Sequence, residues 1–226
     1  MTITTTSLTR AAGISAAVAG LIFIAVQINH PPMDVSSVAT TEWVVRNSAK
    51  VVMGVLALVG ISGMYLRQVR QVGLLGLIGY LLFGAGYLLM FSTEVVSAFV
   101  LPGLVNLAPG YVNDILVAVA GGTPVGDIGA MKTVLAVTGV GYMVGGLIFG
   151  IALFRARILA RWASALLAVG TIATVLLAVL PESFNRPMAV PAGVALVGLG
   201  VSLWRDRRAQ APEAAVAAIR VEHVSV

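Results

Sequence analysis

The chain has 226 residues, of which 59% are hydrophobic and 10% charged, and its mean hydropathy is +1.00. A soluble domain carries about 25% charged residues, so this composition leaves too little polar surface for a protein in water and indicates one embedded in a bilayer. The net charge is +5, but the basic residues stand at the ends of apolar runs and form no stripe with aromatic residues, which argues against a nucleic-acid partner. The chain contains no cysteine, which excludes disulfides and thiolate chemistry.

Six apolar segments are long enough to cross about 30 Å of hydrocarbon as helices. Helices are expected because only helices and closed barrels satisfy their own backbone in lipid, and these runs lack the alternation of barrel strands. The first segment has no cleavage pattern after it, so we expect a retained helix rather than a signal peptide. We place the segments at about 11–28, 49–66, 72–100, 130–154, 161–180 and 187–204.

The sequence therefore predicts an all-α fold: a polytopic six-transmembrane-helix bundle over residues 1–208, followed by a flexible cytoplasmic tail at 209–226. Segments 49–66, 130–154 and 187–204 each end with an aromatic residue and then an arginine. This similarity allows a fold of three helical hairpins, although interfacial aromatic residues and inner arginines are common to membrane helices.

The basic residues divide unequally between the two sides of such a bundle. One side has ten and the other four, so the positive-inside rule puts the first side in the cytoplasm, together with both termini. Longer loops at about 29–48 and 101–129 then lie outside, and residues 111–120 are expected to form a short surface or re-entrant helix. The ten are Arg10, Arg67, Arg70, Arg155, Arg157, Arg161, Arg205, Arg207, Arg208 and Arg220; the four are Arg46, Lys50, Lys132 and Arg186.

The third apolar segment carries the polar residues that we consider for a site. A single helix over 71–100 would be about 45 Å long, so we expect it to be tilted, kinked or extended outward. Glu94 then lies near the outer boundary of the membrane. Tyr80, Tyr87 and Glu94 are spaced by seven and share a face with Phe91 and several glycines, which should face protein because lipid would leave the polar groups unpaired.

Two interpretations of this face stay open. In the functional one, Glu94 is the acid–base group of a ligand pocket. In the structural one, the glycines allow close helix packing and Glu94 pairs with Lys132, at the outer start of the fourth segment. The other candidate pocket residues are Tyr80, Tyr87, Phe91, Tyr142, Lys132 and His30. No characteristic spacing around His30 supports a metal site, and no cofactor is predicted.

Four stretches of the chain resemble a group of small, uncharacterised multi-helix integral membrane proteins of high-GC Gram-positive (actinobacterial) type. The resemblance runs from about residue 10 to 208, and it implies a helical membrane fold in a bacterial plasma membrane without contributing catalytic residues. The stretches are Gly60–Gln68 (GISGMYLRQ), Gly73–Tyr80 (GLLGLIGY), Ala98–Pro102 (AFVLP) and Gly145–Ala156 (GGLIFGIALFRA).

Three functions are consistent with these features. The first is binding or moving a small apolar or amphipathic molecule, such as a membrane lipid. The second is an accessory role, in which a partner membrane protein or another copy of the chain completes the assembly. The third is a metal-independent enzyme embedded in the membrane that acts on a lipid or isoprenoid in the manner of a terpene cyclase. Glu94 would then be the acid–base group, and tyrosines would stabilise a developing cation.

Overall fold

The computed structural model describes residues 4–174 and 186–206. All its regular elements in these ranges are helical, which confirms the predicted all-α class. The end of the predicted span 161–180 and the predicted tail at 209–226 lie outside the described residues.

Five helical segments in the described part are long and apolar enough to cross a membrane. The remaining predicted span, 161–180, is represented by the shorter α8, so six spans stay a prediction. The five are α1 (Thr5–Ala25), α3 (Thr41–Arg67), the run from α4 (Val69–Val95) to α5 (Leu101–Leu104), α7 (Met131–Ala156), and the 3₁₀-turn Pro187–Ala189 with α9 (Val190–Trp204). The shorter helices are α2 (Val35–Val38), α6 (Pro109–Val119) and α8 (Arg161–Ile172).

The long third segment is interrupted twice, in agreement with its excess length. Gly73 has φ 56° and ψ −151°, a conformation that a residue with a side chain rarely adopts. Val96–Val100 forms a π-helical turn between α4 and α5. The short helix expected at residues 111–120 is confirmed as α6.

The second membrane helix begins earlier than its hydropathy predicts. The Thr40 side chain accepts a hydrogen bond from the backbone N–H of Trp43 at 3.2 Å and caps α3 at Thr41 rather than near residue 49. Hydropathy misses these two turns because they carry Glu42, Arg46 and Asn47. The polar start of α3 is therefore helical, and it places these side chains at one end of the bundle.

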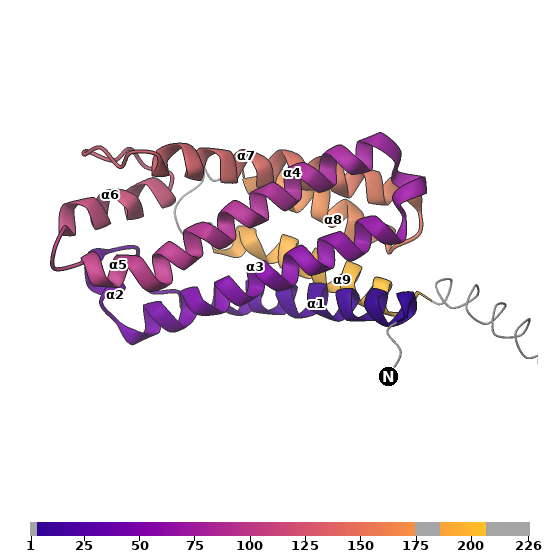
Figure 1. Ribbon diagram of the computed structural model, residues 1–226, viewed down its shortest axis with the longest axis horizontal. Helices are drawn as coiled ribbons and strands as arrows, with labels where there is room; N and C mark the ends of the chain where they lie inside the picture. Colours follow the sequence, from indigo (N-terminus) through magenta and orange to yellow (C-terminus); the bar gives the residue numbers. More distant parts are fainter. Residues whose placement is uncertain (1–3, 175–185, 207–226) are drawn as a thin grey trace, which may run out of the picture.

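The long helices and α8 pack as a closed ring in chain order. Each helix lies against the next, from α1 to α3, α4, α7, α8 and α9, and α9 packs back on α1 (Figure 1). The ends of α3, α7 and α9 lie together with the start of α1, and Arg67 forms an ion pair with Asp206 at 2.7 Å there. We call this the arginine end; the opposite end is covered by α2, α5 and α6, which we call the cap.

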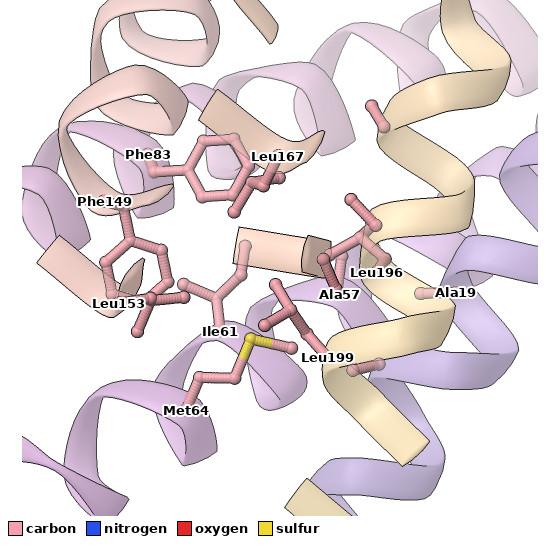
Figure 2. Packing of buried hydrophobic residues seen from close by; sticks show 14 of the residues in the cluster. Ala19, Ala57, Ile61, Met64, Phe83, Phe149, Leu153, Leu167, Leu196 and Leu199 are labelled. Carbon is pink, nitrogen blue, oxygen red and sulfur yellow. The ribbon is translucent and has the colours of Figure 1, made fainter. Parts of the chain in front are cut away.

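Glycines set the closest contacts of the ring. At Gly86 of α4, an added Cβ would lie 2.6 Å from the backbone N of Tyr142 and 2.7 Å from the carbonyl C of Gly141, both in α7. Gly145 faces α4, whereas Gly146 and Gly150 face α8, so glycines allow close packing on both sides of α7. The space between the helices is filled by apolar side chains pointing inward from four of them (Figure 2): Phe83, Ile61, Met64, Phe149, Leu153, Leu196 and Leu199.

The cap has a small apolar core of its own. Its buried members come from α2, α5, α6 and the loop before α7, together with Trp43 from the start of α3. Trp43 is 2% exposed, and its indole Nε1–H donates to the carbonyl of Ser97 at 2.9 Å, within the π-helical turn. This bond fixes the cap to the ends of α3 and α4. The buried residues are Val38, Trp43, Leu101, Val112, Ile115, Leu116 and Ile128.

Gly86→Leu should destabilise the protein by about 1–3 kcal/mol or more, because the side chain would overlap the backbone of α7. Gly84→Leu is the matched control on the same helix, since an added Cβ there meets nothing within 4 Å. The control should change stability by no more than about 0.5 kcal/mol. Thermal unfolding in detergent measures both, and equal losses would contradict the assigned face of α4.

Candidate functional site

An ion pair joins α3 to α4 beneath the cap. The Lys50 Nζ lies 3.6 Å from Glu94 Oε2, and the two side chains are only 14% and 18% exposed. Lys50 also donates to the Asn47 Oδ1 at 2.9 Å, and the Asn47 amide donates to the carbonyl of Trp43 at 2.9 Å. The helical start of α3 thus presents Trp43, Asn47 and Lys50 along one face toward the end of α4.

His30 lies beside this pair in the loop after α1. Its Nδ1–H donates to the Pro31 carbonyl at 2.8 Å, and its ring meets Trp43 edge to face at a centroid distance of 6.3 Å. Because Nδ1 carries the proton in this bond, Nε2 is a bare acceptor. Nε2 is buried, and it has no hydrogen-bond partner among the described residues.

The environment of His30 keeps it neutral at pH 7. Burial, together with the positive charges of Lys50, Arg186 and Arg46, lowers the pKa of His30 to about 4, against the hydrogen bond to Pro31, which raises it. A neutral ring with an unused acceptor next to several cations can receive a hydrogen bond from a ligand.

Two arginines complete the polar cluster. Arg46 pairs with Glu42 at 2.8 Å and donates to the carbonyl of Ile28 at 2.8 Å, which holds the chain leaving α1. Arg186 donates to the Gln27 Oε1 over a long 3.4 Å, and burial lowers the pKa of Arg186 while the nearby Glu94 carboxylate raises it. Within the described part, Lys50 and Arg186 therefore accompany Glu94, while Arg46 is paired with Glu42 at the exposed start of α3.

The aromatic residues expected to surround Glu94 lie elsewhere. Tyr87 and Tyr142 are buried against Phe83, with centroids 5.0 and 5.8 Å from its ring, and they form part of the packed core between α4 and α7. Tyr80 stacks on Tyr65 of α3 at 4.5 Å. These rings belong to the packed interior of the bundle, whereas Glu94 pairs with Lys50 beneath the cap.

Of the remaining candidates, Tyr80 and Phe91 serve helix packing and Lys132 lies away from Glu94. The phenol of Tyr80 hydrogen-bonds with Ser62 at 3.1 Å, and Phe91 lies where a Cβ on Gly54 would meet it at 3.2 Å, so both serve the packing of α3 on α4. The prediction that Lys132 pairs with Glu94 is wrong. Lys132 is exposed at the start of α7, whereas Glu94 faces α3 and pairs with Lys50.

Of the predicted site residues, the structure places only Glu94 and His30 in the polar cluster. Sequence reasoning missed Lys50, Asn47 and Arg186. The signal for the first two was the spacing of Asn47 four residues after Trp43 and of Lys50 three residues after Asn47, which places all three on one helical face, but it could be used only if α3 was known to begin before residue 49. Arg186 has no such local signal, because it approaches the cluster from the far end of the chain.

The cluster offers hydrogen-bond donors from Lys50 and Arg186 and an acceptor at His30 Nε2. Within residues 4–174 and 186–206, no three histidine, aspartate or glutamate side chains gather as a metal site would require. The donors of Lys50 and Arg186 and the acceptor of His30 can bind a polar group.

No protein-family model, no curated protein and no solved structure matches the chain.

Protonation of His30 should make the protein less stable in acid. The pKa of His30 is lowered to about 4 in the folded state, against about 6.5 in an unfolded chain, so the unfolded state binds more protons between these values. The stability present above pH 6.5 is therefore lost as the pH falls toward 4. Because the ring is partly exposed to solvent, we expect the free energy of unfolding to fall by only about 1 kcal/mol, which corresponds to a decrease in Tm of about 2–4 °C.

His30→Gln should reduce this decrease, because glutamine does not titrate. His223→Gln, which changes the chain's other histidine, is the control. Thermal unfolding in detergent at pH 7.5 and pH 4.5 measures the effect. An acid-induced decrease that is unchanged in His30→Gln would show that other groups cause it.

Proposed function

We propose that this protein binds a small amphipathic molecule at the capped end of the bundle and holds its polar group in the cluster around Lys50 and Glu94. The observation that carries the proposal is a charged pair, 3.6 Å apart and mostly buried, beside an acceptor on His30 that no described residue satisfies. Ionisable residues within membrane helices are costly and usually mark functional sites.

The geometry of the pair supports a role beyond stability. Removing two charges from water costs several kcal/mol per ion, and only excellent geometry offsets that cost. A separation of 3.6 Å exceeds the distance of a charge-assisted hydrogen bond, which is about 2.7–2.9 Å. Lys50 and Glu94 therefore have bonding capacity left for another molecule.

The cluster also indicates the kind of polar group that fits. Arg186 and Lys50 favour an acceptor with negative charge, such as a carboxylate or phosphate, and Nε2 of His30 needs a donor, such as a hydroxyl. On the same helical run as Glu94, Leu88 and Phe99 are 54% and 60% exposed. An apolar chain lying there would remain in lipid while its polar group enters the cluster.

An enzyme with Glu94 as its acid–base group has less support. That alternative requires tyrosines around the reacting centre, whereas Tyr87 and Tyr142 pack against Phe83 in the core. We therefore favour binding or movement of an amphipathic molecule over acid–base or terpene-cyclase-like chemistry.

Molecules that remain bound after purification in mild detergent test the proposal. Extraction and mass spectrometry should find an amphipathic compound in near-stoichiometric amount with the unaltered protein. Glu94→Gln and Arg186→Gln should each retain it at least tenfold less well, since a charge–charge contact of about 1.4 kcal/mol corresponds to that factor.

Glu42→Gln is the matched control, because Glu42 forms its ion pair at the exposed start of α3. Monodisperse elution of each variant separates lost binding from lost folding. The same extracted compounds in all four proteins would reject the site. A co-purifying membrane protein in place of a small molecule would instead favour an accessory role.

We also propose that the arginine end faces the cytoplasm of a bacterial plasma membrane and the cap faces outward, with six spans. The support is the excess of arginines at that end, which the positive-inside rule associates with the cytoplasm.

The absence of native cysteine allows a direct test of this orientation. In intact cells, a membrane-impermeant maleimide should label Thr123→Cys, in the exposed loop before α7, and should label Gln71→Cys, at the exposed start of α4, only after lysis. Labelling of Gln71→Cys in intact cells, with labelling of Thr123→Cys only after lysis, would show the opposite orientation and contradict the proposal.

A further inference from the structure

A second polar feature lies at the arginine end, far from the cap. A cleft of about 400 Å³ opens where α7 gives way to α8, and its lining consists of Phe154, Arg155, Arg157 and Arg161. Three cationic side chains and one aromatic ring therefore surround a space with no acidic residue in its wall.

The three guanidinium groups are available to a ligand. None of them forms an ion pair or side-chain hydrogen bond with the described residues. At this end of the described part the acidic residue is Asp206, and it is bound to Arg67 at 2.7 Å. The local charge around the cleft is thus strongly positive.

Two of the arginines are held in place by the fold. The Arg161 guanidinium lies 4.2 Å above the centre of the Phe154 ring, which fixes its plane and leaves its N–H edges free. Arg161 is also the first residue of α8, a helix end with partial positive charge and no side-chain cap.

Arg157 occupies a strained backbone position. It ends α7 with φ 56° and ψ 27°, the left-handed conformation that glycine usually supplies at this place. An arginine there costs conformational energy, and non-glycine residues in such conformations concentrate at ligand sites. This observation, independent of the cleft, also indicates that the position serves binding.

We propose that this cleft binds the phosphate headgroup of an anionic phospholipid in the leaflet at the arginine end. Arginine recognises phosphate oxygens through paired N–H groups, and basic pockets between membrane helices suit lipid headgroups. A lipid is favoured over a free phosphate compound because apolar surface adjoins the cleft. Ile151, one helical turn before Arg155, and Trp162, which follows Arg161 in the chain, are 40% and 59% exposed.

Native mass spectrometry of the full chain with added lipids tests the proposal. Phosphatidylglycerol should bind in preference to phosphatidylcholine. Each arginine near a lipid surface contributes about 1 kcal/mol, which is about fivefold in affinity. Arg155→Gln, Arg157→Gln and Arg161→Gln combined should therefore weaken phosphatidylglycerol binding roughly a hundredfold.

Arg10→Gln, which removes one positive charge, is the control for the single variant Arg157→Gly, because Arg10 is exposed on α1, a helix that packs on α3 and α9. Arg157→Gly separates binding from folding. It should raise the Tm by about 2 °C by relieving the left-handed conformation, and it should weaken lipid binding about fivefold.

Four results would overturn the proposal: unchanged binding in the triple variant, an equal loss in Arg10→Gln, equal affinity for phosphatidylcholine, or unchanged binding in Arg157→Gly. Soluble glycerol 3-phosphate distinguishes the source of the phosphate. It should bind far more weakly than the lipid, and equal affinity would assign the cleft to a soluble phosphate compound instead.

Discussion

The contact of α4 with α7 through glycine is the constraint on which the other positions in the bundle depend. Backbone groups of Gly86 and Gly141 come together without intervening side chains. Because the two helices are this close, the rings of Phe83, Tyr87 and Tyr142 fill the space beside the contact and leave no opening at mid-depth. Lipid supplies little hydrophobic drive between helices, so such van der Waals packing carries the association.

Dense packing at mid-depth confines polar chemistry to the two ends. The capped end holds both signs of charge around Lys50 and Glu94, whereas the charged residues that line the opposite cleft, Arg155, Arg157 and Arg161, are all cationic. The first arrangement suits a polar group with donors and acceptors, and the second suits an anion. The two sites therefore differ in chemistry as well as in position.

The membrane class and helix positions could be predicted from the sequence because hydropathy depends on local composition. The start of α3 could not, because Thr40 caps a helix whose first turns are too polar for a hydropathy window. Because the start of this helix was placed near residue 49, Lys50 stood at the edge of a span, and Lys132 was predicted as the partner of Glu94 instead. Spacing on α4 grouped Glu94 with Tyr87, but it could not show that Glu94 pairs with Lys50 of α3 whereas Tyr87 packs against Tyr142 of α7.

Trp43 links the cap to the polar cluster. Its indole bonds to Ser97 while its ring touches His30 and its carbonyl holds Asn47, the neighbour of Lys50. Lifting the cap would break these contacts together and admit water to the buried charges. The position of the cap and the packing around Lys50 and Glu94 are therefore mechanically coupled through one side chain.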